Sequence, residues 1–249
     1  MFEGRVAVVT GASGQIGTQV ALSLAERGAL LVLADVHPRI DPMPGTQKAI
    51  YRQTDVANAG AVAELMRTAE REFGRLDILV NVAGIVSLGS ADALDEAEWD
   101  RVLDINLRGT FLCCQSAIRI MRKNKYGRII NLGSIVGKNG GNARPWLDRT
   151  EQSRAANVAY GVSKAGVHMM TVFLAREVSA DGITVNAVAP GPIASSMTSD
   201  FPEALRALIP VGRMGQAADV ANACLFLASE QSGFITGEIL DVNGGMWGD

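Results

Sequence analysis

The sequence predicts an α/β protein with one doubly wound parallel β-sheet and helices on both of its faces, in a single domain. Three observations lead to this prediction. Short runs rich in β-branched residues alternate with amphipathic segments, the length of 249 residues suits one large domain, and no internal repeat or Pro/Gly linker divides the chain. Strand–helix alternation is typical of parallel sheets, because each crossover between parallel strands needs a long connection, usually a helix.

The predicted elements alternate along the whole chain. The strands that we expect are Val6–Thr10, Leu30–Ala34, Ala49–Thr54, Ile78–Val82, Arg128–Leu132, Thr184–Ala189 and Ile239–Val242. The helices that we expect are Gln15–Arg27, Ala59–Phe73, Glu96–Asn124, Val158–Ala180 and Ala217–Leu227. Runs of β-branched residues favour strands, and amphipathic periodicity favours helices.

Two stretches depart from this alternation. Residues 137–157 are polar and Gly-rich, and residues 192–211 contain three prolines. Each follows a predicted strand, and open α/β sheets bind ligands beyond the C-terminal ends of their strands. We therefore expect an inserted loop and a substrate-loop region that shape a pocket, although a surface insertion without this role remains the alternative for the first. The side chains in the insertion that could contact a substrate or a neighbouring subunit are Arg144, Trp146, Arg149 and Arg154.

Composition excludes several classes of protein. A net charge of -3 gives no support for a nucleic-acid partner. The apolar runs 29–34 and 78–82 are too short to span a bilayer. Because Met1 leads almost directly into the first strand, we expect no signal peptide and a cytoplasmic location. The three cysteines lack paired spacing and the chain has two histidines, so we expect buried thiols and no metal ion.

A glycine-rich turn follows the first predicted strand, with Gly11, Gly14 and Gly17 leading into a helix. Such glycines let the backbone approach a pyrophosphate, which the helix N-terminus then holds. Asp35 ends the second strand, 18 residues after Gly17, where a carboxylate can accept hydrogen bonds from ribose hydroxyls and repels a 2′-phosphate. The turn contains no basic residue, and Arg39 is the first one after Asp35. We therefore predict a Rossmann-type site for NAD rather than NADP.

Tyr160 and Lys164 are four residues apart in a segment with helical periodicity. Positions i and i+4 share one helix face, about 5–6 Å apart at Cβ. A free tyrosine has a pKa of about 10, and a neighbouring ammonium favours the phenolate. We therefore expect Lys164 to lower the pKa of Tyr160. His168 lies near the same face, and we expect a helix-packing or subunit contact from it, with a substrate contact as the alternative.

Several motifs together resemble the short-chain dehydrogenase/reductase family over essentially the whole chain. They are Thr10–Gly17, Asp55–Val56, Asn81–Gly84, the four residues Asn106, Ser134, Tyr160 and Lys164, and Pro190–Ser195. The resemblance implies that those four residues are catalytic. With the reasoning above, the cofactor contacts that we expect are Gly11, Ser13, Gln15, Ile16, Gly17, Asp35, Asp55, Val56, Asn81, Ala83, Gly84, Tyr160, Lys164, Pro190, Gly191, Ile193 and Ser195.

Each catalytic residue has a chemical reason to be present. Ser134 can donate a hydrogen bond to a carbonyl or alkoxide oxygen, and Tyr160 can exchange a proton with the same oxygen. Lys164 is expected to lower the tyrosine pKa and to hold the nicotinamide ribose. Asn106 is expected to hold a water that links Lys164 to solvent, with a helix kink or an interface asparagine as the alternative.

The chain also departs from the family pattern. Gln15 stands where the middle glycine is expected, which gives a spacing more typical of the longer, extended branch of the family. Val82 replaces a second asparagine, and Ser195 stands where threonine is commoner. Ser134 and Tyr160 are 26 residues apart, about twice the spacing usual in the family, which places the additional residues in the 137–157 stretch.

The resemblance implies an oxidoreductase that moves hydride between a secondary alcohol, or the matching ketone, and the nicotinamide. We expect NAD as the cofactor and a polyol, sugar or cyclic alcohol as the substrate. The alternative is a 3-oxoacyl-[acyl-carrier-protein] reductase, although those enzymes generally use NADPH. An extended-branch epimerase or dehydratase and a catalytically silent NAD sensor are further alternatives. In the family, helices pair across subunits, so we expect a homotetramer through helices 99–121 and 158–178, with a dimer second.

Overall fold

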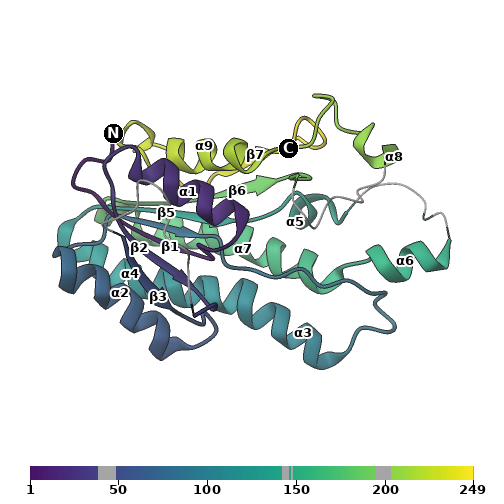
Figure 1. The fold of residues 1–249 in the computed structure, drawn as a ribbon, viewed down its shortest axis with the longest axis horizontal. Helices are drawn as coiled ribbons and strands as arrows, with labels where there is room; N and C mark the ends of the chain where they lie inside the picture. The colour runs from purple at the N-terminus through teal and green to yellow at the C-terminus, as the bar shows by residue number, and fades with distance from the viewer. Residues whose placement is uncertain (39–48, 142–145, 147, 195–202, 249) are drawn as a thin grey trace.

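Seven parallel strands form the sheet in the described part of the chain, between two layers of helices (Figure 1). The computed structural model describes residues 1–38, 49–141, 146, 148–194 and 203–248. The strands are β1 Val6–Thr10, β2 Leu30–Asp35, β3 Ile50–Gln53, β4 Ile78–Asn81, β5 Gly127–Leu132, β6 Ile183–Pro190 and β7 Ile239–Val242. Their order is β3-β2-β1-β4-β5-β6-β7. All seven predicted strands are confirmed, and the chain reverses its direction of winding between β1 and β4, where such sheets bind ligands.

Helices cover both faces of this sheet, as predicted (Figure 1). Helices α1 and α9 pack together on one face, and α2, α4 and α7 lie on the other. Their bounds are α1 Gln15–Ala25, α2 Ala59–Phe73, α4 Thr110–Asn124, α7 Val158–Val178 and α9 Ala217–Ala228. Strand β1 shows why both faces are covered. Val6 and Val8 enter one apolar cluster while Ala7 and Val9 enter the other, because successive strand side chains point to opposite faces.

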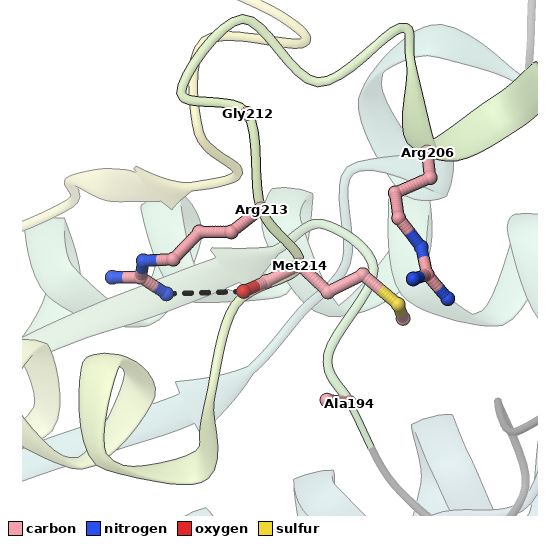
Figure 2. A pocket seen from close by; sticks show the side chains of 5 residues that line it. All are labelled: Ala194, Arg206, Gly212, Arg213 and Met214. Carbon is pink, nitrogen blue, oxygen red and sulfur yellow. Dashed lines mark hydrogen bonds between the residues drawn. The ribbon is translucent and has the colours of Figure 1, made fainter. Parts of the chain in front are cut away.

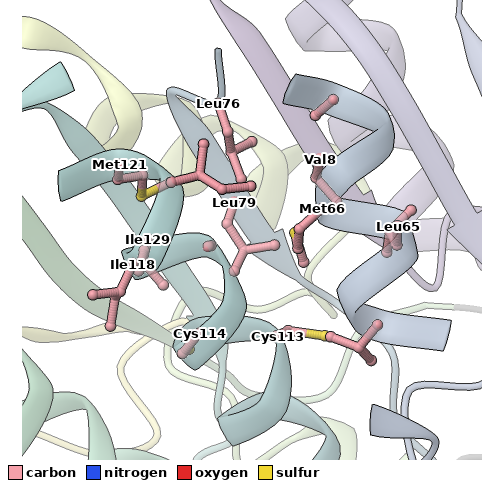
Figure 3. Packing of buried hydrophobic residues seen from close by; sticks show 14 of the residues in the cluster. Val8, Leu65, Met66, Leu76, Leu79, Cys113, Cys114, Ile118, Met121 and Ile129 are labelled. Atoms are coloured by element: carbon pink, nitrogen blue, oxygen red, sulfur yellow. The ribbon is translucent and has the colours of Figure 1, made fainter. Parts of the chain in front are cut away.

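The cluster between the sheet, α2 and α4 is closed by large apolar side chains (Figure 3). Leu65 and Met66 come from α2, and Met121 comes from α4. Cys113 and Cys114 are free thiols in the same cluster, as predicted. Burial raises the pKa of both thiols. They are therefore unreactive core residues, since the thiolate is the reactive form of cysteine.

The predicted helix Glu96–Asn124 is interrupted. It consists of α3 Glu96–Leu103, a π-helical segment Asp104–Gly109 and α4. Asn106 lies in the π segment, and its carbonyl oxygen accepts a 2.7 Å hydrogen bond from the Thr110 hydroxyl. Its side chain bonds both backbone groups of Ile85, at 2.8 and 2.9 Å. Hydrogen bonds therefore stabilise the π-helical segment, and the periodicity of a sequence cannot reveal them. Segments of this kind are frequent at functional sites.

The insertion at 137–157 is not a loop throughout, so the prediction is wrong for part of it. It contains most of α5 Val136–Asn139 and the whole of α6 Arg149–Ala155. The Asp148 carboxylate begins α6 by accepting a 2.7 Å hydrogen bond from the backbone N–H of Glu151, a capping pattern that stabilises a first turn. After α6, the Ala156 carbonyl accepts a 2.8 Å bond from the backbone N–H of Gly89. The insertion is therefore fastened to the segment after β4.

The 192–211 stretch contains one short helix in its described part, α8 Glu203–Arg206. Ser195 and Arg144, named above as candidate contacts, lie outside the described residues. Among the described residues, one helical segment, Val158–Asp181, is long and apolar enough to cross a membrane by length and composition alone. Its α7 part packs against β6 and α5 and buries Lys164 and His168, as the core helix of a sheet protein does.

Candidate active site

The glycine turn between β1 and α1 fits a pyrophosphate. Gly11 has a φ of +64°, and a Cβ there would lie 2.7 Å from the backbone nitrogen of Ala83. A Cβ at Gly17 would overlap the carbonyl oxygen of Gly11. Helix α1 starts after Gly14 with no side-chain hydrogen bond at its cap. Its N-terminus therefore keeps the bare N–H groups and positive dipole end that hold phosphates, and this is the part of the structure that a dinucleotide fits.

The Asp35 carboxylate lies at the end of β2, beside this turn. One carboxylate oxygen accepts a 3.0 Å hydrogen bond from the backbone N–H of Ser13 and the other a 3.2 Å bond from that of His37. Burial by itself would raise the pKa of Asp35, but hydrogen bonds from Ser13 and His37 lower it below its ordinary value. The group is therefore a fixed negative charge at the predicted ribose position.

The segment after β4 is aligned by β1. The Thr10 hydroxyl accepts 3.2 Å hydrogen bonds from the backbone N–H groups of Val82 and Ala83. Asn81, a predicted cofactor contact, turns its side chain inward and donates to Asn131 Oδ1 at 2.9 Å. Its amide group therefore supports the sheet, which leaves the backbone that follows it as the candidate cofactor contact of this motif. Thr10 was not singled out from the sequence, although its place at the strand end is a usable signal.

Asp55 and Val56 lie where β3 leads into α2. Asp55 is exposed, and its carboxylate accepts a 2.9 Å bond from the backbone N–H of Ala57. Val56 is buried against Gly109. Both are placed at the carboxyl edge of the sheet, as expected of residues beside an adenine, although Val56 is also a packing residue.

Tyr160 lies on α7 close enough to Ser134 for the serine side chain to lower the pKa of the tyrosine. Ser134 is held by two further contacts. Its hydroxyl accepts a 3.2 Å bond from the backbone N–H of Val136, and its own backbone N–H donates to His168 Nε2 at 3.3 Å. His168 is therefore a packing residue that orients the serine loop, as expected. The spacing of 26 positions between serine and tyrosine does not separate the two groups in space.

Lys164 is buried beside Tyr160, but not as predicted. Its Nζ donates a 2.7 Å hydrogen bond to the carbonyl oxygen of Leu132 and lies 5.7 Å from the centre of the Tyr160 ring. Burial lowers the pKa of Lys164 to about 8. Burial also raises the pKa of Tyr160, an effect that the neighbouring Ser134 side chain partly offsets. The prediction that Lys164 lowers the pKa of Tyr160 is wrong for the protein chain by itself, because desolvation dominates at both groups.

Asn106 joins the catalytic group through the backbone of α7. Its Nδ2 donates a 3.0 Å bond to the Ser163 hydroxyl, which donates at 2.7 Å to the carbonyl oxygen of Tyr160. A Cβ at Gly84 would lie 3.2 Å from Asn106 Oδ1 and 3.5 Å from Lys164 Nζ. The four residues of the predicted tetrad therefore converge at one place. Ser163 is a member that the sequence reasoning missed, although it directly precedes Lys164.

The end of β6 and the segment after it lie beside the loop that carries Ser134. The carbonyl oxygen of Pro190 accepts a 3.0 Å bond from the backbone N–H of Ile135, next to Ser134. A Cβ at Gly191 would lie 2.9 Å from Asn243 Cα, so only glycine fits there. Ile193 pairs with Gly215 through a β-bridge.

Ile16, in the first turn of α1, packs against the apolar cluster on the sheet face that α1 and α9 cover. Within the described ranges, no cluster of three or more His, Cys, Asp or Glu side chains could hold a metal ion.

Comparisons with known proteins agree with this geometry. The family model described as Enoyl-(Acyl carrier protein) reductase matches residues 11–247. The chain is 39% identical, over 98% of its length and 97% of the relative's, to the (2S)-[(R)-hydroxy(phenyl)methyl]succinyl-CoA dehydrogenase subunit BbsD of Thauera aromatica. It is 39% identical to the 3-oxoacyl-[acyl-carrier-protein] reductase FabG of Escherichia coli, covering 99% and 98% of the two chains.

A ring-alcohol enzyme and a solved structure are also similar. The cis-4-hydroxycyclohexanecarboxylate dehydrogenase of Sinomonas cyclohexanicum is 39% identical, over 98% of this chain and 97% of the relative. The crystal structure of gox2181 superposes with a TM-score of 0.86 at 34% identity, covering 98% of this chain and 96% of that one. The family match runs from the glycine turn to beyond the last strand. The chain is therefore a member of the short-chain dehydrogenase/reductase family of oxidoreductases.

Proposed function

We propose that the protein is an NAD(H)-dependent oxidoreductase that transfers hydride between a secondary alcohol and the nicotinamide, with Tyr160 as general acid/base. The observation that carries this proposal is the convergence of the Tyr160 and Ser134 side chains beside the buried amine of Lys164, whose Nζ lies 5.7 Å from the centre of the Tyr160 ring. Two hydroxyls so placed can share one substrate oxygen. The nicotinamide, when bound, supplies the hydride acceptor or donor.

Each of these residues has its own role in the reaction at the substrate oxygen. During oxidation Tyr160 accepts the hydroxyl proton, and during reduction it returns one. Ser134 donates a hydrogen bond to the oxygen as negative charge develops on it. Burial lowers the pKa of Lys164 to about 8, so its amine can hold or release a proton at mildly alkaline pH. Asn106 orients the first turns of α7, and a water held between it and Lys164 remains part of the proposal.

NAD is proposed rather than NADP because of Asp35. Its pKa is below the ordinary value, so it is ionised at neutral pH and repels a 2′-phosphate. Ser13, Gly14 and Gln15 in the turn supply no positive charge that could offset this. The matching measurement is kcat/KM with both cofactors. A preference for NADP would reject this part of the proposal while leaving the tyrosine chemistry intact.

The substrate is proposed to be a secondary alcohol, and ring alcohols are the first candidates to test. One of the similar proteins is named as the dehydrogenase of a hydroxycyclohexanecarboxylate, which is a ring alcohol. Another is named as the dehydrogenase of a hydroxy(phenyl)methylsuccinyl-CoA, a thioester whose hydroxyl lies outside the ring. The second candidate is reduction of a 3-oxoacyl thioester, which the similarity to FabG supports. Asp35 favours the first candidate, because the 3-oxoacyl reductases of the family generally use NADPH.

The deciding experiment is turnover by wild type, Tyr160→Phe and the control Tyr51→Phe, over polyols, sugars, cyclic alcohols and 3-hydroxyacyl thioesters. Loss of the proton carrier should reduce kcat by roughly 10²- to 10⁴-fold, with NADH affinity nearly unchanged in a fluorescence titration. The control tyrosine lies on β3 and should retain full turnover. Undiminished activity in Tyr160→Phe would reject the catalytic assignment, and activity only with NADPH and thioesters would select the second candidate.

We also propose a cytoplasmic homotetramer that associates through the 99–121 and 158–178 helices. Phe173 and Met169 on α7 are 68% and 57% exposed, and Val162 and Phe111 are exposed on the same helix layer. Exposed apolar patches on this scale mark association surfaces. The three cysteines are free and buried, which is consistent with a reducing compartment.

A further inference from the structure

A pocket of about 270 Å³ opens beyond the C-terminal end of β6. It is lined by Ala194, Arg206, Gly212, Arg213 and Met214. Figure 2 shows the Met214 side chain extending toward Arg206, while the Arg213 side chain extends in the opposite direction. The Met214 and Arg206 side chains therefore place an apolar group beside a guanidinium, and the volume of the pocket suits a small ring or a short chain rather than a dinucleotide.

The two arginines of this pocket differ in what they bind. Arg213 donates to both carboxylate oxygens of Asp219, at 2.7 and 3.1 Å, and to the carbonyl oxygen of Met214 at 3.0 Å. Its donors and its charge are therefore taken within the protein.

The charge and the Nε donor of Arg206 have much weaker partners within the protein. Its Nε lies 3.7 Å from a Glu203 carboxylate oxygen, and the Glu203 side chain is 83% exposed. The Nε atom is itself buried and has no hydrogen-bond partner among the described residues. A buried donor without a partner costs free energy, which a ligand oxygen would recover. The guanidinium fork suits a carboxylate, because it can donate two parallel hydrogen bonds to it.

The pocket is connected to the region of the catalytic hydroxyls by the segment that follows β6. The Pro190 carbonyl is bonded to the backbone N–H of Ile135, which is next to Ser134. From Pro190 the chain reaches Ala194 in four residues, a span of at most about 14 Å when fully extended. Ala194, which lines the pocket, therefore lies within about 14 Å of the strand end that contacts the serine loop.

We infer that Arg206 binds a carboxylate group on the substrate, so that the enzyme acts on a secondary alcohol that also carries a carboxylate. Met214 packs against the carbon skeleton between the two groups. Arg206 is thus a specificity-determining residue, and this inference rests on the proposed function because it assumes the same alcohol site. The phosphates of a dinucleotide are the other anionic groups that Arg206 could bind, but the glycine turn and the N-terminus of α1 already supply a site for them.

A binding experiment tests this without turnover. Calorimetry of the NAD-loaded full-length protein compares cyclohexanecarboxylate with neutral cyclohexanecarboxamide, for wild type, Arg206→Met, Arg206→Lys, Glu203→Gln and the remote control Arg67→Gln on α2. Arg206→Met should weaken carboxylate binding about tenfold, the range of a charge-assisted hydrogen bond at a partly exposed site. Arg206→Lys should recover part of the loss, and Glu203→Gln should tighten binding because it removes the competing carboxylate.

Carboxamide binding and the Arg67→Gln variant should show no change. The inference is overturned if wild type does not prefer the carboxylate, if Arg206→Met weakens both ligands equally, or if it weakens NAD instead, which would assign Arg206 to the cofactor phosphates. Turnover of 4-hydroxycyclohexanecarboxylate against its methyl ester provides the kinetic counterpart. Failure of the proposed function would instead appear as no Tyr160-dependent NAD reduction with any alcohol.

Discussion

The Gln15 side chain donates a 2.9 Å hydrogen bond to the carbonyl oxygen of Ala194. These residues are 179 positions apart and join the dinucleotide turn to the segment after β6. Gln15 stands where the family pattern has a glycine, so a residue that departs from the pattern makes a contact that glycine could not.

This contact predicts a role for Gln15 in holding the cofactor. Gln15→Met keeps the length of the side chain but removes the donor, and a solvent-exposed neutral hydrogen bond contributes about 0.5–1.5 kcal/mol. We expect the Kd for NADH to rise roughly two- to tenfold, with kcat little changed. Fluorescence titration measures this, with Gln19→Met on the same helix as the control. Equal Kd values in both variants would show that the contact does not act on the cofactor.

Asp35→Asn should relax the choice of cofactor. The substitution keeps the shape and part of the hydrogen bonding of the side chain but removes the charge that faces the 2′ position. We expect the ratio of kcat/KM with NAD to that with NADP to fall about tenfold or more, since one charge contact is worth about 1.4 kcal/mol or more at partly buried sites. Asp100→Asn, an exposed position on α3, is the matched control. An unchanged ratio would reject the role of Asp35.

Lys164 should make stability depend on pH in a defined direction. Its pKa falls from 10.5 to about 8 on folding, so between these values the unfolded chain binds more protons and the Lys164 contribution to stability rises with pH. Below pH 8 both states are protonated and the burial penalty is complete, on the order of 3 kcal/mol.

Urea unfolding of wild type and Lys164→Met at pH 7 and pH 10 measures this effect. The methionine variant should gain stability relative to wild type at pH 7, and about 2 kcal/mol of that advantage should disappear at pH 10. Comparing the two proteins cancels the buried cysteines, whose raised pKa values lower stability above pH 9 in both. A difference that does not vary with pH would mean that Lys164 is not desolvated.

The exposed face of α7 predicts how the chain associates. Phe173→Glu places a charge on the most exposed large apolar side chain of α7, where burial in an interface would leave it unpaired. Light scattering coupled to size exclusion should show a smaller assembly than wild type, with folding retained in circular dichroism. Gln53→Glu on the outer strand β3 should leave the mass unchanged. An unaltered mass in Phe173→Glu would place the interface elsewhere.

The sequence by itself determined the sheet, the glycine turn and which residues are proposed as catalytic. Each of these depends on local patterns. Runs of β-branched residues predict strands. Gly11 and Gly17 lie where the backbone is too crowded for a Cβ. The spacing of Tyr160 and Lys164 places them on one helix face.

Only the tertiary structure decided the environment of those residues. The inward turn of Asn81, the π segment at Asn106, the helix within the insertion and the raised pKa of Tyr160 all arise from contacts between distant segments. So does the pocket at Arg206. Desolvation and long-range hydrogen bonds depend on which segments pack together, and no local periodicity carries that information.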